Sequence, residues 1–282
     1  MADHPSDDRN PDYLAINKAS WNQRTEVHID SAFYDNESFL ADRSSLNEIE
    51  LRLLDDITGK SVLHLQCHFG QDTISLARLG ARVTGADFSD KAIEKAKELA
   101  ELTGANASFI CCDIYELPKY LDEQFDIVFT SYGVIGWLPD LDQWAGVVSR
   151  FLKPGASFIF VEFHPVVWMF DDDFQGIRYN YFNTGPIVEN SEGTYADKNA
   201  PVINEDVMWN HGLGEVVSAL LQSGLELSAL EEYDYSPYAC FKRTVEYEPG
   251  KFRIKHLQDK IPMVYSVCCR KPFLKQGESI GL

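Results

Sequence analysis

The sequence predicts an α/β fold: a Rossmann-like three-layer sandwich with a mainly parallel seven-stranded sheet and an antiparallel strand pair near its C-terminal end. Three observations lead to this prediction. Between residues 60 and 163, short apolar segments alternate with helical patterns, as in parallel sheets covered by helices on both faces. Glycine or proline marks most of the junctions. The last two apolar segments have no convincing helix between them, which favours antiparallel neighbours.

The individual elements follow from periodicity and from stop signals. Strands are expected at 61–67, 81–87, 107–113, 125–131, 156–163, 225–236 and 261–271. Helices are expected at 13–28, 43–56, 71–79, 90–102, 140–152 and 215–223. Ser89 is the predicted cap of the fourth helix, and Asn210 or His211 the predicted cap of the last one.

The chain is expected to form one domain built from successive parts. These parts are an N-terminal helical cap (1–57), an α/β core (58–164), an inserted lid (165–208), a segment that completes the sheet (209–272) and a tail (273–282). The lid segment is aromatic, acidic and broken by glycine and proline. Because so long a structureless loop is uncommon in a compact domain, we expect it to contain a hairpin.

The amino-acid composition limits the classes of partner that we expect. The 282 residues include 44 acidic and 25 basic side chains, a formal net charge of −19. Such a surface repels phosphate backbones, so nucleic acid and anionic membranes are disfavoured and a small-molecule substrate is favoured. Six cysteines occur without a Cys-x-x-Cys pattern, and no metal site is expected. No apolar run resembles a signal peptide or a membrane span, so a cytoplasmic location is expected. A homodimer is left open.

The loop after the first strand, Gln66 to Gly70, lies where open parallel sheets bind ligands, beyond the carboxyl ends of the strands. Asp87 ends the second strand, at the place and spacing of an acid that accepts hydrogen bonds from ribose hydroxyls. A dinucleotide needs glycines for close approach of its pyrophosphate, and Gln66 and His68 would obstruct it. S-adenosylmethionine (SAM), which carries adenosine without phosphate, makes a weaker demand on this loop.

Five segments in order resemble the motifs of the class I SAM-dependent methyltransferases, specifically their small-molecule branch. They are "VLHLQCHFG", "VTGADFSDKAIEKAKE", "FICCDIYELP", "FDIVFTSYGVIGWLPD" and "FLKPGASFIFVEF". Each is a weak signal alone, but the ordered set is specific. The resemblance covers residues 60–162 and extends more loosely to Lys271. The first segment departs from the family pattern, because only one of its three glycines, Gly70, is kept.

The resemblance implies a set of cofactor-binding residues. Asp87 would bind the ribose, Phe88 and Ile114 would flank the adenine, and Asp113 would accept from its amino group. The backbone from Gln66 to Gly70 would wrap the methionine portion. His64 replaces the acid of the first motif; Gln66 could offer its carbonyl instead, and His68 could donate to the carboxylate. The cofactor-binding prediction therefore comprises His64, Gln66, His68, Gly70, Asp87, Phe88, Asp113, Ile114 and Thr130.

Methyl transfer needs aligned reactants and exclusion of water, so aromatic walls and a lid are expected. The predicted substrate-contacting residues are Trp21, His28, Tyr34 and Trp137. Tyr132 and His164 are the predicted catalytic residues, with His164 as a general base because histidine titrates near neutrality. His164 is equally compatible with a polar turn before Pro165.

The acceptor remains open at this stage. Acids in the lid could receive a cationic substrate; they are Asp171, Asp172, Asp173, Glu189 and Glu192. Arg24 and Arg178 could equally bind a carboxylate. Two other functions compete with the methyltransferase. One is a non-catalytic SAM-binding protein, suggested by the missing acid of the first motif. The other is an NAD-dependent oxidoreductase of similar topology.

Overall fold

A seven-stranded sheet forms the centre of the computed structural model, which describes residues 12–273. Its strands are β1 (Ser61–Leu65), β2 (Arg82–Asp87), β3 (Ala107–Cys111), β4 (Phe125–Ser131), β5 (Leu152–Phe163), β8 (Glu226–Tyr233) and β11 (Val264–Arg270). They lie in the order β3-β2-β1-β4-β5-β11-β8. Strands β1 to β5 pair in parallel, and β11 runs antiparallel to both of its neighbours. The predicted fold class is confirmed.

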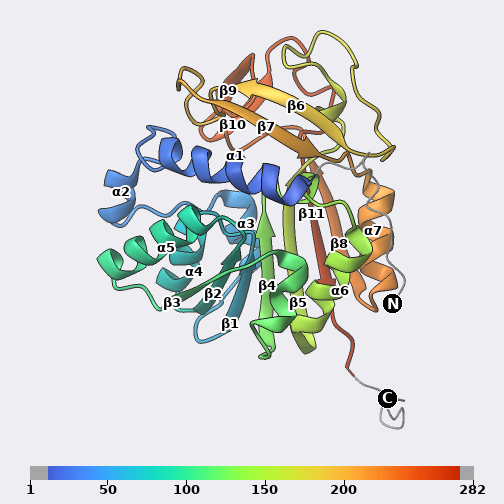
Figure 1. Cartoon of the computed structure of the whole chain (residues 1–282). Coiled ribbons are helices and arrows are strands. Elements are labelled where there is room, and N and C mark those ends of the chain that lie inside the picture. The colour runs from blue at the N-terminus through green and yellow to red at the C-terminus, as the bar shows by residue number, and fades with distance from the viewer. Residues whose placement is uncertain (1–11, 274–282) are drawn as a thin grey trace, which may run out of the picture.

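Helices cover both faces of the sheet (Figure 1). Helices α3 (Glu48–Leu54), α4 (Gln71–Arg78) and α5 (Asp90–Thr103) pack on one face. The 3-10 helix η1 (Ile114–Lys119), α6 (Leu141–Phe151) and α7 (Leu213–Gln222) pack on the other. In β1, Val62 contributes to one core and Leu63 to the other. This two-sided burial explains why the strand is apolar throughout rather than alternating.

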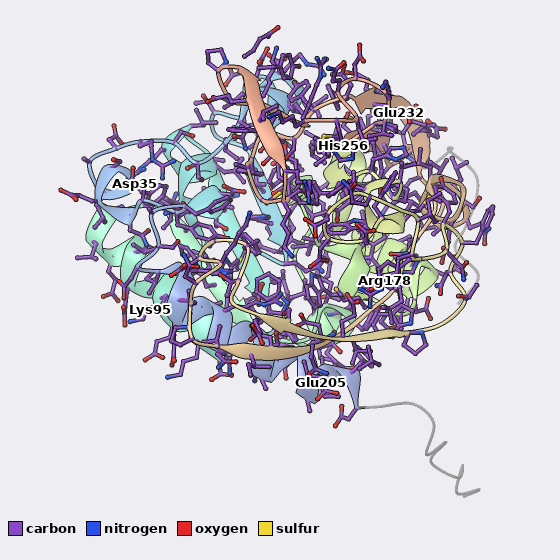
Figure 2. The ribbon with its side chains drawn as sticks, turned by 90° about the horizontal axis from the view of Figure 1, so that it is seen from above. Asp35, Lys95, Arg178, Glu205, Glu232 and His256 are labelled. Carbon is purple, nitrogen blue, oxygen red and sulfur yellow. The ribbon has the colours of Figure 1, made fainter. Side chains whose placement is uncertain are left out.

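An upper layer lies beyond the carboxyl ends of the parallel strands (Figure 1). It contains α1 (Tyr13–His28), α2 (Asn36–Leu40), the antiparallel hairpin of β6 (Ile187–Glu192) with β7 (Ile203–Met208), and that of β9 (Thr244–Glu248) with β10 (Lys251–Ile254). Figure 2 looks onto this layer, with Glu205 on the β6–β7 hairpin and Arg178 in the connection before it. Two further 3-10 turns are η2 (Ile135–Trp137) and η3 (Val167–Met169).

Helix α1 links the sheet layer to the β6–β7 hairpin. The Asn17 side chain donates to the Val207 carbonyl at 2.8 Å and accepts from the Val207 amide at 2.9 Å. On the core side, Ser89 donates to the Asn22 side chain at 2.7 Å. Ser89 also caps α5 by accepting from the Ala92 amide, as predicted. The upper layer is thus hydrogen-bonded to the core through one helix.

Two local predictions were wrong, and one element was not predicted. The helix predicted at 43–56 forms only at Glu48–Leu54, because Ser45 bonds to α4 and an Asn47 capping box begins the helix later. The hairpin β9–β10 was not predicted, although Pro249-Gly250 between two alternating segments is its turn signal. Helix α7 begins at a Gly212 N-cap without a side-chain bond, because His211 instead contacts Glu215 and the Leu138 carbonyl.

The six cysteines are all free thiols. Cys111 is exposed and Cys112 buried, as expected for neighbours on opposite faces of a strand end. Among residues 12–273, no helix is both long and apolar enough to cross a membrane.

Candidate cofactor and acceptor site

A cavity of about 1100 Å³ lies between the sheet's carboxyl edge and the upper layer. We call its lining residues between 64 and 163 the core wall, and those of 165–211 together with 238–242 the insertion wall. Helix α1 and the segment after it, through Ser45, close one side. Pockets for single drug-sized ligands usually span about 300–1,000 Å³. The cavity therefore has room for two small molecules side by side.

The first-motif loop, Gln66 to Gly70, keeps a glycine-like backbone at each glycine position of the family pattern. Gln66, His68 and Gly70 have φ angles of 54°, 50° and 84°. A Cβ on Gly70 would lie 2.9 Å from the Phe109 ring, so that position cannot carry a side chain. Positions 66 and 68 instead line the cavity. Left-handed backbone at non-glycine residues costs roughly 1–3 kcal/mol each and is concentrated at functional sites.

Two polar atoms of this loop are buried without a hydrogen-bond partner among the described residues: Oε1 of Gln66 and Nε2 of His68. The Gln66 Nε2 donates to the Val134 carbonyl at 2.9 Å, which fixes the amide. The His68 Nδ1 lies 3.3 Å from the Tyr34 hydroxyl. Burial, helped by nearby Arg24, lowers the pKa of His68 to about 3, so the imidazole is neutral.

Asp87 ends β2 beside this loop. Its carboxylate accepts from the backbone amides of His68 and Ser89, both at 2.9 Å. Burial raises the pKa of Asp87 to about 6, and these backbone donors hold it lower than burial alone would. Asp113 caps η1 by accepting from the Tyr115 amide at 3.1 Å, and burial raises its pKa as well.

The structure brings most of the predicted cofactor residues to the cavity. His64, Gln66, His68, Gly70, Asp87, Phe88, Asp113 and Ile114 all line it. His64 bonds through Nδ1 to the Thr73 hydroxyl at 2.8 Å, and burial lowers its pKa to about 3. A neutral imidazole at position 64 supplies no anion.

Three predicted site residues lie elsewhere. Thr130 is fully buried in the sheet, where its hydroxyl donates to the Leu65 carbonyl at 3.0 Å. His28 is fully buried behind the cavity lining, with its ring against those of Trp21, His68 and Tyr195. In each case the predicted element is right, but the side chain points away from the cavity.

His164 is the third. It accepts through Nδ1 from the Val166 amide at 3.2 Å, the alternative turn role noted above. Its Nε2 lies 2.9 Å from the Glu232 carboxylate, and it is not among the residues that line the cavity. Burial lowers its pKa despite Glu232. The general-base role has no geometric support at this position.

The remaining predicted residues, Trp21, Tyr34, Trp137 and Tyr132, line the cavity. The Arg24 guanidinium lies 5.4 Å from the ring centres of both Trp21 and Trp137. It forms a buried ion pair with Asp206 of β7 at 2.5 Å. The Tyr34 hydroxyl lies 2.5 Å from that of Tyr195, in the connection between β6 and β7.

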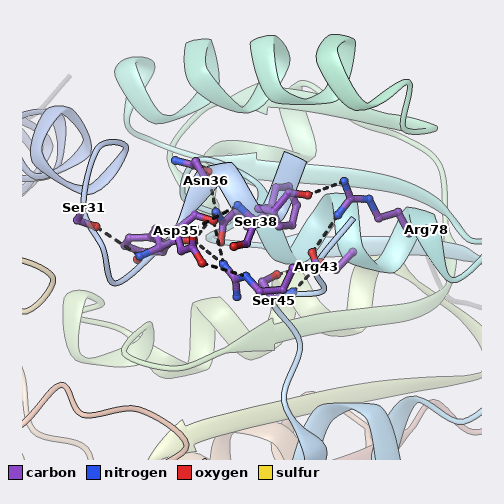
Figure 3. Close-up of polar contacts among 11 residues, drawn as sticks. Ser31, Asp35, Asn36, Ser38, Arg43, Ser45 and Arg78 are labelled. Atoms are coloured by element: carbon purple, nitrogen blue, oxygen red, sulfur yellow. Dashed lines mark hydrogen bonds and ion pairs between the residues drawn. The ribbon is translucent and has the colours of Figure 1, made fainter. Parts of the chain in front are cut away.

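The segment between α1 and α3 carries Tyr34 and Ser45 to the cavity, and it is held by basic and amide side chains (Figure 3). Arg43 donates to the Tyr34 carbonyl at 2.5 Å, and Gln71 donates to the Asn36 side chain at 2.7 Å. Arg78 of α4 donates to the carbonyls of Phe39 and Arg43. The contacts tie this segment to the start and end of α4.

An acidic cluster that the sequence analysis missed lies at the junction of the two walls. Asp72, in the first turn of α4, lines the cavity and accepts from the Ser45 hydroxyl at 2.6 Å and the Ser131 hydroxyl at 3.2 Å. The Tyr132 hydroxyl donates to fully buried Glu50 at 2.8 Å. Burial and, secondly, Asp72 raise the pKa of Glu50 to about 7. An acid in a first helical turn reads as dipole compensation, so nothing in the sequence singled out Asp72.

Glu162 shapes the exit of β4. Its carboxylate accepts from the backbone amides of Gly133, Val134, Ile135 and Phe163, and the Glu162 side chain is 2% exposed. Burial raises its pKa. This acid holds the loop that carries Tyr132, whose φ is 44°, and Trp137.

The charges of the insertion wall and its margin pair with one another. Arg178 lies 3.3 Å from Glu189, Lys242 lies 2.9 Å from Asp172, and Arg243 lies 3.0 Å from Asp173. Asp171 accepts from the amides of Asp173 and Gln175. Of the acids expected to receive a cationic substrate, Asp172, Asp173 and Glu189 thus pair with basic residues of the chain. Both arginines expected to bind a carboxylate, Arg24 and Arg178, pair with acids of the chain.

Comparison with known proteins adds to this geometry. Residues 62–155 match the family described as "Methyltransferase domain". The chain is 37% identical over 114 residues to an uncharacterized methyltransferase of Synechocystis sp., 40% of this chain and 51% of that protein. It is 32% identical over 118 residues to a ubiquinone biosynthesis O-methyltransferase of Coxiella burnetii, 41% of this chain and 50% of that protein. The chain thus spans about half the length of these curated relatives.

Solved structures show the same fold. A SAM-dependent methyltransferase of Methanosarcina mazei superposes with a TM-score of 0.56 at 20% identity, over 81% of this chain and 99% of that one. A glycopeptide N-methyltransferase solved with SAM gives a TM-score of 0.51 at 17% identity, over 79% and 92% of the two chains. The order of the sequence motifs, the order of the strands and the family match over residues 62–155 all point to the same methyltransferase fold. The chain has the fold of these SAM-dependent methyltransferases, and its residues 62–155 are similar to a methyltransferase domain.

Proposed function

We propose that this protein transfers a methyl group from SAM to a small-molecule acceptor. One observation carries the proposal: the Asp87 carboxylate lies at the edge of a large cavity, next to a strained loop whose Gln66 Oε1 and His68 Nε2 are buried without partners. Buried polar atoms without partners are costly, and a ligand that bonds to them removes the cost. The residues present therefore fit a nucleoside that carries a polar tail.

The core wall would hold the cofactor. Asp87 would accept from ribose hydroxyls, Phe88 and Ile114 would flank the adenine, and Asp113 would accept from its amino group. SAM supplies an electrophilic methyl group on a sulfonium. The chain's own contribution is to align the reactants and exclude water, which together can account for about 7–11 kcal/mol of a barrier.

The acceptor would occupy the space beside the insertion wall. Several aromatic side chains belong to this wall: Trp168, Phe170, Phe174, Tyr238 and Phe241. Since Arg178 pairs with Glu189 and Lys242 with Asp172 there, we propose an acceptor with a flat apolar body and a single nucleophilic O–H or N–H. The net charge of −19 supports a small-molecule acceptor over nucleic acid or an anionic membrane.

Tyr132 and Glu50 are the groups that could receive the acceptor's proton. Tyr132 lines the cavity, and its hydroxyl donates to Glu50. It would take a proton from the acceptor while passing its own to Glu50, whose pKa of about 7 suits a base at neutral pH. This proposal replaces His164 as the base and keeps Tyr132 as the predicted catalytic residue.

Calorimetric titration of the purified protein with SAM and, separately, with NADH tests the proposal. We expect SAM to bind and NADH not to bind. A screen of phenol, amine and thiol acceptors should then release S-adenosylhomocysteine. Binding of NADH without SAM would support an oxidoreductase, and SAM binding with no turnover on any acceptor would support a non-catalytic SAM-binding protein.

A further inference from the structure

The Asp72 carboxylate lines the cavity without a positive charge beside it. Among residues 12–273 it accepts from the Ser45 hydroxyl at 2.6 Å and the Ser131 hydroxyl at 3.2 Å, and none of the arginines and lysines that line the cavity pairs with it. Burial raises the pKa of Asp72, and the two serine bonds hold it lower than burial alone would. A buried carboxylate without a counter-charge is unfavourable, so a cationic group of a ligand would be stabilised here.

Four tyrosines from separate segments of the chain surround this carboxylate. They lie before α2, after β4, between β6 and β7, and after β8, and all line the cavity: Tyr34, Tyr132, Tyr195 and Tyr238. Burial is the largest cause that raises the pKa of each hydroxyl, and the negative charge of Asp72 contributes in all four cases. Asp72 is therefore close to aromatic side chains that converge from four directions along the chain.

The rings of these tyrosines form a continuous arc. The Tyr132 and Tyr238 ring centres lie 5.1 Å apart with their planes at 86°. Phe33 continues the arc, with its ring centre 5.6 Å from that of Tyr238 and 5.5 Å from that of Tyr195. The Tyr195 hydroxyl in turn lies 2.5 Å from that of Tyr34. Because the faces of aromatic rings attract cations, the arc is a second feature, independent of the carboxylate, that favours a positively charged ligand.

The tyrosine hydroxyls bond to groups other than this carboxylate. Tyr132 donates to Glu50 at 2.8 Å, and Tyr238 accepts from the Asn47 side chain at 2.7 Å. Within the described part of the chain, no hydrogen bond joins Asp72 to any of the four tyrosines. A carboxylate offers about four acceptor sites, and the two serines use two of them. Asp72 therefore keeps acceptor capacity for the N–H groups of a ligand.

We propose that the acceptor is an amine that binds in its ammonium form, and that Asp72 is the residue that selects it. The ammonium group would donate to the Asp72 carboxylate and lie against the tyrosine rings, and the apolar body would extend along the insertion wall. The inference rests on the proposed function, and it narrows the acceptor from an O–H or N–H group to an amine basic enough to be protonated at neutral pH.

The neighbouring residues account for the proton that an ammonium must lose before it can react. Tyr132 would take this proton from nitrogen while its own proton passes to Glu50. The freed lone pair would then form the nitrogen–carbon bond to the methyl group, and the electron pair of the broken carbon–sulfur bond would stay on sulfur. The product is a methylated ammonium, so Asp72 faces a positive charge both before and after the transfer.

A matched ligand series on the whole protein, saturated with S-adenosylhomocysteine so that no turnover occurs, gives the first test. The probes are phenethylamine, phenethyl alcohol and phenylacetate, each also with a naphthyl body in place of the phenyl. By calorimetry we expect the amine to bind at least about tenfold more tightly than the alcohol, and the carboxylate to bind most weakly. Equal affinities of amine and alcohol, or no binding of either amine, would overturn the proposal.

Acid-to-amide substitutions give the second test. Asp72→Asn should reduce the affinity for the amine to about that for the alcohol and leave the affinity for S-adenosylhomocysteine unchanged. Asp172→Asn is the matched control, because this acid lines the same cavity but is paired with Lys242; it should keep the preference for the amine. If Asp72→Asn lost affinity for S-adenosylhomocysteine and kept the preference for the amine, Asp72 would belong to the cofactor and the proposal would be wrong.

A third test separates the rings from the carboxylate. Tyr238→Leu should weaken the amine by about threefold relative to the alcohol, whereas Tyr238→Phe, which keeps the ring, should retain the preference. A preference in Tyr238→Leu equal to that of the wild type would remove the rings from the proposal. Should Asp72→Asn not fold by circular dichroism, this pair of variants and the wild-type series still decide the question.

Failure of the inference is distinguishable from failure of the proposed function. If the wild-type protein does not bind S-adenosylhomocysteine, the proposed function itself is wrong. If it binds S-adenosylhomocysteine and then binds the alcohol as tightly as the amine, only the ammonium site is wrong, and the acceptor is a neutral group.

Discussion

The core wall and the insertion wall face the same cavity, but their polar groups differ. Several on the core wall lack a partner, whereas charged groups on the insertion wall pair with each other. On the core wall, Gln66, His68 and Asp72 present atoms that no described residue satisfies or neutralises. On the insertion wall, Arg178 pairs with Glu189, and Lys242 with Asp172.

We infer from this difference that the core wall binds the ligand and that the insertion wall encloses it. A polar group that is left incomplete, at the cost of strained backbone, marks a place where a ligand completes the structure. A charged group that is paired with its neighbour shapes a wall and needs no ligand. The acidic run of residues 171–173 is conspicuous in the sequence, but its carboxylates are bound by basic side chains or backbone amides. Asp72 stands alone in the sequence, and among the described residues it has no cationic partner.

The largest effect should come from the buried ion pair between Arg24 of α1 and Asp206 of β7. Arg24→Met would leave Asp206 buried without its counter-charge, and we expect a loss of about 3–5 kcal/mol in unfolding free energy. Urea unfolding followed by circular dichroism measures this. Adding Asp206→Leu to the variant should recover much of the loss. A change below about 1 kcal/mol in the single variant would show that the pair is no stronger than an exposed one.

Asp87→Ala tests the core wall directly. The carboxylate would make two hydrogen bonds to ribose hydroxyls, so removing it should weaken SAM binding by about 100-fold, near 2.7 kcal/mol. Calorimetry at pH 8 gives the number. Because burial raises the pKa of Asp87 to about 6, wild-type affinity should itself fall as the pH drops through this value and the carboxylate is protonated. Affinity that is flat from pH 8 to pH 5 would argue against this role.

Glu50 predicts a pH dependence of stability. Its pKa is about 7 in the folded protein against an ordinary value of 4.5, so the folded state binds the proton more tightly than the unfolded state. Stability should therefore fall as the pH rises from 5.5 to 8, by about 2 kcal/mol from this group. Glu50→Gln should flatten that part of the curve. Thermal or urea unfolding of both proteins at the two pH values makes the comparison.

The smallest effect is expected on the insertion wall. Lys242→Met breaks a pair with Asp172 in which both side chains are at least half exposed. We expect less than about 1 kcal/mol in stability and no change in SAM affinity. A tenfold loss of SAM affinity would mean that the cofactor extends to the insertion wall and that the contrast between the walls is wrong.

Much of this could be predicted from sequence, because the relevant signals are local. Strand and helix periodicity predicted the sheet, and the spacing from Gly70 to Asp87 singled out an acid that does line the cavity. How deeply a side chain is buried, and which way it points, depend on residues that are distant in the sequence. His28, Thr130 and His164 sit on the expected elements but point into packed interior, and their neighbours come from distant parts of the chain.

The acidic cluster of Asp72 and Glu50 could not be predicted for the same reason. Asp72 accepts hydrogen bonds from Ser45 and Ser131, and Glu50 accepts one from Tyr132. These partners lie between 27 and 82 positions away in sequence, so no motif could contain them. The loop glycines are a third case: which of the three positions must stay glycine depends on Phe109, a residue of β3.

A crystal structure of the protein with S-adenosylhomocysteine tests the central claim most directly. We predict ribose hydroxyls on the Asp87 carboxylate, the adenine between Phe88 and Ile114, and the amino-acid end of the ligand against the loop of Gln66 to Gly70. The insertion wall should keep its own ion pairs. A ligand bound among the aromatic residues of the insertion wall, with Gln66 and His68 still without partners, would contradict the account.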